Sequence, residues 1–176
     1  AHHQNAVAER AILTVTEMAR TMLLHAIIHW PDETELDLWS FSMDHAVFVW
    51  NNLPNREHGA APIELWTGQL FKNFDHLKNL HVFGCPAYVL EPTFQDGKKL
   101  PRWVPRTCRG QYLGVAQDHA STVGRIRNLT SGHVSPQFHV VHDDFFTTVL
   151  NTNDHIGDAD NQPLVDVEAI LATKYS

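Results

Sequence analysis

The 13 histidines of this 176-residue sequence are the first side chains to consider as metal ligands. His25 and His29 are four residues apart, so both could face one ion from the same side of a helix. The residues between them lack the glutamate of the metalloprotease signature. A second group offers nitrogen and oxygen ligands at the end of a predicted strand: His139, His142, Asp143 and Asp144. Both groups are more typical of an ordinary helix and a charged strand end than of a metal site.

Positive charge is concentrated in one stretch of the chain. Residues 98–127 hold 7 Lys/Arg and 1 Asp/Glu, against 5 and 12 in residues 1–97 and 1 and 7 in residues 128–176. The net charge of -7 excludes a uniformly basic nucleic-acid binder but not a local basic patch. Cations interleaved with Trp103 and Tyr112 can neutralise phosphates and stack on bases, although a solvated basic loop has the same composition. The candidates are Lys98, Lys99, Arg102, Arg106, Arg109, Arg125 and Arg127.

The two cysteines, Cys85 and Cys108, are too few for a disulfide framework or a four-cysteine zinc site. We therefore expect a reducing, intracellular setting, with Cys85 as a small core residue. The sequence has no uninterrupted apolar run of the roughly 18 residues that cross a bilayer, so no membrane partner is expected.

Apolar periodicity predicts three helices in the N-terminal part of the chain. An apolar face runs from Val7 to Ala26 at helical spacing and predicts a helix over residues 5–28. A second helix is predicted over residues 36–51, and a short third helix from Pro62 to a stop at Gly68. The residues predicted to line the buried side of the second helix are Leu36, Trp39, Met43, Ala46, Val47 and Trp50.

From about residue 80 the period changes to that of short strands. A strand broken at Pro86 is predicted over residues 81–90. Further strands are predicted over residues 111–115, 123–129 and 137–141, with a turn at residues 130–133. Several short strands in so few residues indicate a small antiparallel β-barrel. The predicted class is therefore α+β.

The predicted organisation has three parts. A helical part occupies residues 1–70 and the β-barrel occupies residues 77–148. A polar, acidic linker and tail, with a weak helix over residues 163–173, occupy residues 149–176.

Short motifs follow one another along the chain in a fixed order. They are Gln4-Asn5-Ala6-Val7-Ala8-Glu9-Arg10, Glu17-Met18-Ala19-Arg20, Pro62-Ile63-Glu64-Leu65-Trp66-Thr67-Gly68, Val82-Phe83-Gly84-Cys85-Pro86-Ala87-Tyr88-Val89, Gly110-Gln111-Tyr112-Leu113-Gly114 and Phe138-His139-Val140-Val141. In that order and at that spacing they resemble the integrase region of copia-type retrotransposons, over roughly residues 4–148. The resemblance implies the helical end of an RNase H-like catalytic core followed by a DNA-binding β module.

The resemblance also implies a metal-dependent transfer of DNA strands. In such integrases two aspartates and one glutamate hold two Mg²⁺ or Mn²⁺ ions, which stabilise the attacking and leaving oxygens. By the motif match Glu9 is the third carboxylate, and so both a catalytic and a metal-binding residue. Asn5, one helical turn earlier, would orient a metal-bound water or the DNA, and Arg10 would reach a phosphate. Without the match, Glu9 is an early-turn glutamate of the kind that the helix dipole favours.

Two departures from the family pattern qualify these expectations. Only eight residues precede Glu9 and none is aspartate, so we expect this chain to be catalytically silent and to bind no metal ion by itself. Ala11-Ile12-Leu13 stand where the family has basic and polar residues, which weakens the case for DNA contact by this helix.

Two functional interpretations remain open. In the first, the chain is a piece of an integrase that retains its DNA-binding β module, with element and target DNA as partners. That interpretation implies self-association and a location in the nucleus or a cytoplasmic particle. In the second, the chain is a non-enzymatic interaction or assembly module of a retrotransposon polyprotein.

Overall fold

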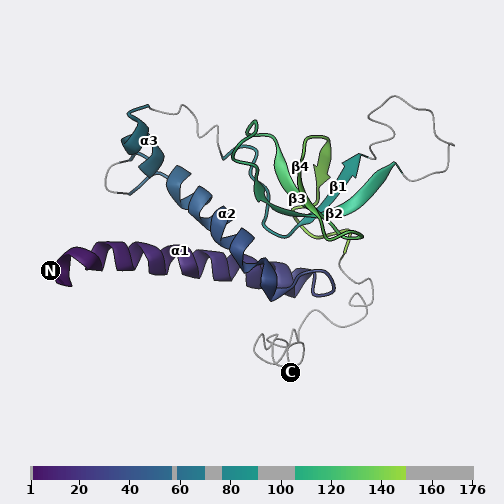
Figure 1. Cartoon of the computed structure of the whole chain (residues 1–176), viewed down its shortest axis with the longest axis horizontal. Coiled ribbons are helices and arrows are strands. Elements are labelled where there is room, and N and C mark those ends of the chain that lie inside the picture. Colours follow the sequence, from purple (N-terminus) through teal and green to yellow (C-terminus); the bar gives the residue numbers. More distant parts are fainter. Residues whose placement is uncertain (1, 57–58, 70–76, 91–105, 150–176) are drawn as a thin grey trace, which may run out of the picture.

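The computed structural model describes residues 2–56, 59–69, 77–90 and 106–149 (Figure 1). The helices lie in the N-terminal part, in the order α1 (His2–His29), the single turn of 3-10 helix η1 (Leu36–Leu38), α2 (Trp39–Asn52) and α3 (Pro62–Thr67). The three predicted helices are confirmed. Pro62 stands at the first position of α3, and Gly68 ends that helix with a left-handed φ of 69°.

Five short strands form one antiparallel sheet. They are β1 (Pro86–Leu90), β2 (Thr107–Val115), β3 (Gly124–Asn128), β4 (Val134–Gln137) and β5 (Val140–His142). Their order in the sheet is β4-β3-β2-β1-β5, so consecutive strands β4 and β5 form the two opposite edges. These edges do not pair with each other, so the α+β class is confirmed but the predicted closed barrel is wrong. Edge strands of only 4 and 3 residues have few backbone groups with which to close a ring.

Two predicted strands differ from the observed ones. The segment predicted as a strand over residues 81–90 is extended only from Pro86, because Gly84 has a φ of 78° and turns the chain just before it. Pro86 then occupies the first position of β1, where its missing N–H removes no ladder bond. The segment predicted as one strand over residues 137–141 belongs to two strands on opposite edges.

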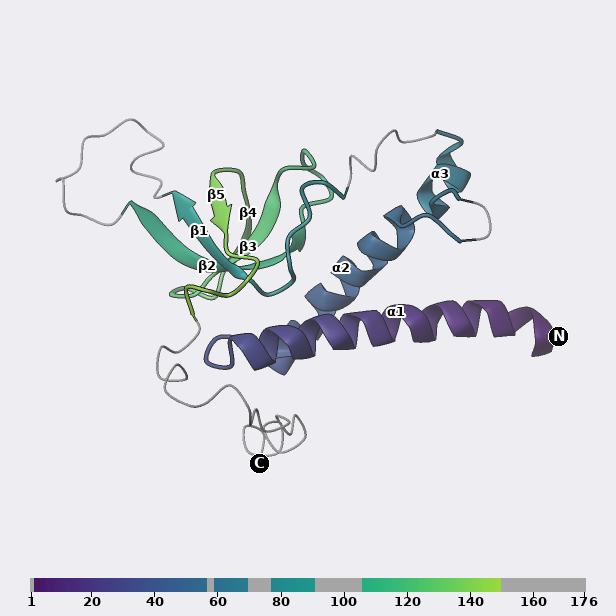
Figure 2. The same cartoon turned by 180° about the vertical axis from the view of Figure 1, so that it is seen from behind.

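The helices and the sheet share an apolar core, in which the C-terminal half of α1 lies beside the sheet (Figures 1 and 2). Successive residues of β2 point to opposite faces, and Leu113 and Tyr112 accordingly belong to different clusters. The first cluster contains Leu23, Ala26, Ile27, Leu38, Phe83 and Leu113. The second contains Trp30, Cys85, Ala87, Tyr112, Ile126 and Phe146. Cys85 is fully buried, as the sequence predicts for a small core residue.

Helix α2 buries a face that coincides with the predicted one only in part. Its buried side chains are Ser42, His45, Ala46 and Val49. Of the predicted residues, Ala46 is buried and Leu36 and Met43 are half-buried, whereas Trp39, Val47 and Trp50 are exposed. The His45 ring lies 5.8 Å from the rings of both Phe83 and Tyr112, so packing against the sheet decides which face is covered.

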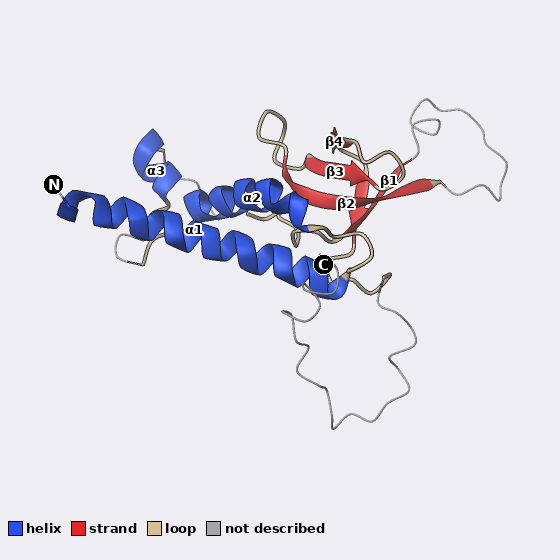
Figure 3. Ribbon diagram, turned by 60° about the horizontal axis from the view of Figure 1, so that its bottom comes forward, coloured by secondary structure: helices blue, strands red, loops and turns tan. Residues whose placement is uncertain are grey.

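A single stripe along α1 is half buried and half exposed. At helical spacings of three and four residues it runs through Asn5, Glu9, Ile12, Thr16, Ala19, Leu23 and Ala26. From Ala19 onward the stripe is buried, but from Asn5 to Thr16 it is exposed, and Ile12 alone is 66% exposed. Figure 3 shows that this N-terminal half of α1 projects away from the sheet.

By length and composition the segment Asn5–His29, with a mean hydropathy of 1.4, could cross a membrane. Only 22% of its most apolar stretch is buried, and the buried part lies in the C-terminal half of α1, which packs against Leu38, Phe83 and Leu113.

Candidate functional site

The predicted metal-binding carboxylate lies on the exposed half of α1. Asn5, Glu9 and Arg10 are all exposed, and Asn5 and Glu9 lie one turn apart on the stripe defined above. Within the described residues no group of three His, Cys, Asp or Glu side chains could hold a metal ion. The two-ion centre of copia-type integrases, which the sequence motifs resemble, needs three carboxylates. The described side chains do not by themselves fit that centre.

The structure describes four of the seven predicted basic residues. Lys98, Lys99 and Arg102 lie outside the described residues. Arg106 and Arg109 are exposed near the start of β2, while Arg125 and Arg127 on β3 are half-buried.

Three of these arginines contact the helical part of the chain. Nη1 of Arg125 lies 3.1 Å from Oδ2 of Asp44 on α2. Nη1 of Arg127 donates a hydrogen bond of 2.9 Å to the carbonyl oxygen of Glu33, and the Arg109 guanidinium lies 5.6 Å from the centre of the Trp30 ring. Each guanidinium keeps further N–H donors, but these three side chains also join the sheet to the helices.

A buried amide strengthens the same junction. The Nε2 atom of Gln111, on β2, donates to the Thr34 hydroxyl at 2.7 Å and to the carbonyl oxygen of Gly84 at 3.2 Å. Gln111 and Thr34 are both fully buried. A buried amide needs such partners, so these bonds fix the position of the loop after α1.

The histidine pair on α1 packs against an aromatic ring. The His25 and His29 rings stack with their centres 4.1 Å apart, and both lie within 5.5 Å of the Phe146 ring. Nδ1 of His29 is 2.8 Å from the carbonyl oxygen of His25. Burial and the neighbouring His29 lower the pKa of His25 below its ordinary value.

The two aspartates after β5 hold the chain around them. Asp143 accepts hydrogen bonds from the Thr147 and Thr148 hydroxyls and from the Thr148 backbone N–H. Asp144 lies 3.0 Å from Nδ1 of His81 and accepts a 2.8 Å bond from the Val82 backbone N–H. The carboxylates predicted as possible metal ligands therefore cap a turn and fasten the segment before β1.

The structure also assembles a polar cluster of His81, Tyr112, His142 and Asp144, of which sequence reasoning had grouped only His142 and Asp144. The His81 and His142 rings stack with their centres 3.6 Å apart, and Tyr112 meets both edge-on. Burial, with His81 nearby, lowers the pKa of His142 to about 4. Burial, aided by Asp144, raises the pKa of the Cys85 thiol far above its ordinary value, so this thiol is a poor nucleophile at neutral pH. His81 and Asp144 lie 63 residues apart along the chain, and no local motif indicates that His81 and Tyr112 join His142 and Asp144.

Substituting Asp144 by asparagine tests the structural role of this cluster. The variant loses a charge-assisted bond with His81, so we expect the free energy of unfolding to fall by about 1–2 kcal/mol at neutral pH. Urea unfolding measures it. The exposed Asp118→Asn is the control, with an expected change of less than about 0.5 kcal/mol. Equal losses in the two variants would contradict the role assigned to Asp144.

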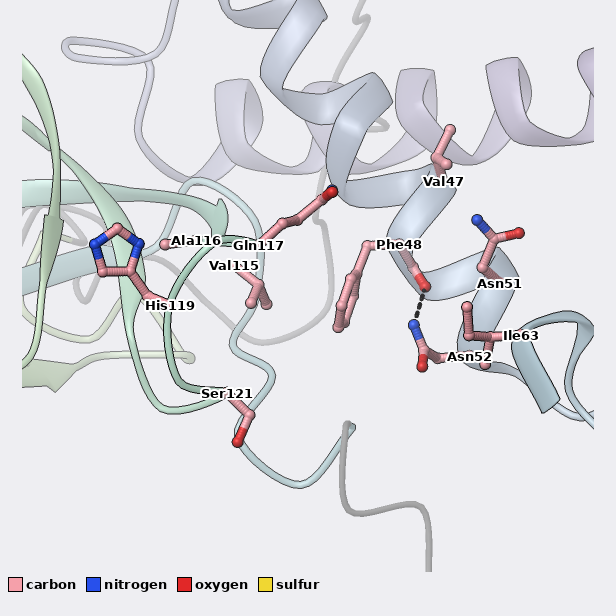
Figure 4. A pocket seen from close by; sticks show the side chains of 10 residues that line it. All are labelled: Val47, Phe48, Asn51, Asn52, Ile63, Val115, Ala116, Gln117, His119 and Ser121. Atoms are coloured by element: carbon pink, nitrogen blue, oxygen red, sulfur yellow. Dashed lines mark hydrogen bonds between the residues drawn. The ribbon is translucent and has the colours of Figure 1, made fainter. Parts of the chain in front are cut away.

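A groove lies between α2, α3 and the turn that follows β2 (Figure 4). Its volume is about 410 Å³, within the range of small-ligand sites. Figure 4 shows the Phe48 ring between the β2 turn and Asn52, with Ile63 and Gln117 on the walls. Sequence reasoning gave no signal for this groove, because its walls come from three separate segments.

No protein-family model matches the chain, and no solved structure matches it either.

Proposed function

We propose that this chain is the C-terminal part of a copia-type retrotransposon integrase, with the helical end of an RNase H-like core and a β module that binds DNA. The observation that best supports the proposal is the divided stripe of α1. Its C-terminal half packs on the β module, and its exposed N-terminal half carries Asn5, Glu9 and Ile12 in line with the buried residues.

An exposed continuation of a buried stripe is suited to a second packing surface. In the proposed integrase, that surface is the sheet that displays the two aspartates. Glu9 would then lie at the junction of the sheet and the helix, with Asn5 one turn away. The exposed side chain of Ile12 is apolar surface that this second contact would bury.

The described residues of this chain do not complete a two-ion centre, so no metal-dependent step is assigned to them. In the complete enzyme, Mg²⁺ or Mn²⁺ would supply Lewis-acid stabilisation of the phosphoryl oxygens. Glu9 is the residue of this chain proposed to bind it, and Arg10 is proposed to contact a phosphate.

DNA binding is proposed for the basic stretch around the start of β2. Arg106 is exposed there, and Lys98, Lys99 and Arg102 precede it in sequence. Arg109, Arg125 and Arg127 retain donors beyond their contacts with the helices. Element DNA and target DNA are the proposed partners, with an intracellular site of action in the nucleus or a cytoplasmic particle.

Charge reversal at Lys98, Lys99 and Arg102 tests DNA binding without disturbing the arginines at the junction. Each lost phosphate contact lowers the slope of log affinity against log salt by about 0.9, so we expect the triple glutamate variant to lose about 2–3 units of slope. Its affinity for duplex DNA at low salt should fall more than about tenfold. Fluorescence anisotropy at several salt concentrations measures both quantities.

The matched control reverses three cations elsewhere, Arg20, Arg56 and Lys78, with the same change in net charge. We expect the control to keep most of the salt slope. If both triple variants lose the same slope, or if the unchanged chain has none, DNA binding by this stretch is refuted.

A second candidate function is that of a non-enzymatic interaction module. It is favoured by the use of Arg109, Arg125 and Arg127 in contacts within the chain. It is also favoured by the groove of Figure 4, because no lysine or arginine is among the described residues that line it.

A further inference from the structure

We propose that the groove between α2, α3 and the β2 turn binds an extended peptide that carries one apolar and one basic side chain. This inference rests on the second candidate function and is independent of DNA binding. The occupant is inferred from the apolar lining, the unpaired carboxamides of Asn51 and Gln117, and the exposed carboxylate of Asp118 beside the groove.

The floor of the groove accepts an apolar side chain. Phe48, Ile63 and Val115 contribute apolar surface from α2, α3 and β2 respectively. Neither Phe48 nor Ile63 is fully buried, so both keep surface that a bound side chain can cover. At about 410 Å³, the space holds a leucine-sized group together with the adjoining peptide backbone.

Three carboxamides lie along the same groove: Asn51, Asn52 and Gln117. The Asn52 amide donates one bond of 2.8 Å to the carbonyl oxygen of Phe48, and its own oxygen remains available. The side chains of Asn51 and Gln117 have no hydrogen-bond partner among the residues that the structure describes. A carboxamide offers one acceptor and two donors, which match the N–H and C=O groups of an extended backbone.

The charge beside the groove favours a partner with a positive charge. A second hollow adjoins the first and shares Gln117 and His119 with it. Its other titratable side chains are Asp44, Asp118 and Arg125. Arg125 is already paired with Asp44. Asp118 is exposed and forms no ion pair within the described part of the chain, so it attracts a cation. A phosphate would meet this carboxylate unfavourably, and for that reason we infer a basic peptide rather than a nucleic acid.

The test uses the full chain labelled with ¹⁵N and synthetic peptides of glycine that carry one leucine and one arginine, one to three residues apart. We expect at least one spacing to produce saturable shifts of the Asn51 and Gln117 side-chain amide signals, with a Kd of about 1 mM or below. Replacing the leucine by glycine, or the arginine by glutamate, should weaken binding at least about tenfold.

Variants of the chain separate the groove from non-specific attraction. Asp118→Lys should raise the Kd of the best peptide at least about fivefold, while Asp32→Lys, in the exposed turn after α1, should leave it unchanged. Circular dichroism shows that each variant is folded. The proposal is overturned if no peptide shifts these amides, if both variants weaken binding equally, or if decathymidylate shifts the same amides and displaces the peptide. Loss of DNA binding through Lys98, Lys99 and Arg102 has no bearing on any of these outcomes.

Discussion

Replacing Gly84 by alanine is expected to lower the free energy of unfolding by about 3 kcal/mol. Gly84 has a φ of 78°, in the left-handed region that an L side chain adopts only with strain. A Cβ at this position would also overlap the Cβ of Ala26, which is fully buried in α1. Neither backbone can retreat freely, because Gly84 N–H is bonded to the carbonyl oxygen of Tyr112 at 2.8 Å. Urea unfolding followed by tryptophan fluorescence measures the loss.

Gly68→Ala provides the matched control for this prediction. Gly68 has a φ of 69°, but nothing lies within 4 Å of an added Cβ, so only the backbone strain of about 1 kcal/mol applies. The double variant Ala26→Gly/Gly84→Ala removes the overlap. Its loss of stability should therefore be smaller than the sum of the losses of the two single variants. Equal losses of stability for Gly84→Ala and Gly68→Ala would contradict the close contact between Ala26 of α1 and Gly84.

The helices were predictable because their signals are local. Pro62 at the start of α3 and a left-handed Gly68 at its end act within a few residues of themselves. The buried face of α2 was not predictable in the same way. Trp39 and Trp50 are the more apolar side chains, yet His45 and Ser42 are buried. The covered side is decided by contacts with Phe83 and Tyr112, which lie far away in sequence.

The sheet could likewise be predicted only in part from local sequence. Strand content and the turn at residues 130–133 follow from local alternation and turn residues. Closure into a barrel depends on whether β4 and β5 meet, and residues 134–142 read alone give no indication that they lie on opposite edges.

For the candidate sites, the sequence indicates which types of residue are present but not which of them come into contact. A cluster of cations in sequence indicates electrostatic potential, but it does not indicate that Arg127 bonds to the carbonyl oxygen of Glu33 on the far side of the junction. The cluster of His81, His142 and Asp144 forms because β1 and β5 pair, with Ala87 opposite His142. The functional role of Glu9 stays a prediction.

Acidification from pH 6.5 to pH 4 is expected to destabilise the fold through His45. This side chain is 3% exposed, and burial, with Arg125 nearby, lowers its pKa to about 4. The folded chain therefore holds His45 neutral, while the unfolded chain takes up a proton as the pH falls below 6.5. Stability is fully present above pH 6.5 and is lost as the pH falls toward 4, by up to about 3 kcal/mol from this one group.

His45→Phe isolates this contribution, because the ring contacts with Phe83 and Tyr112 are kept and the titration is removed. We expect urea unfolding at pH 7, 5.5 and 4.5 to show a shallower fall in stability for His45→Phe than for the unchanged chain. The residual fall belongs to other groups, including His142, whose pKa is also lowered to about 4 by burial. His133→Gln, at an exposed turn, should keep the original pH dependence. Arg125 approaches His45 from β3 and is paired with Asp44 of α2. An unchanged slope in His45→Phe would contradict the lowered pKa of His45 and its contribution to the loss of stability.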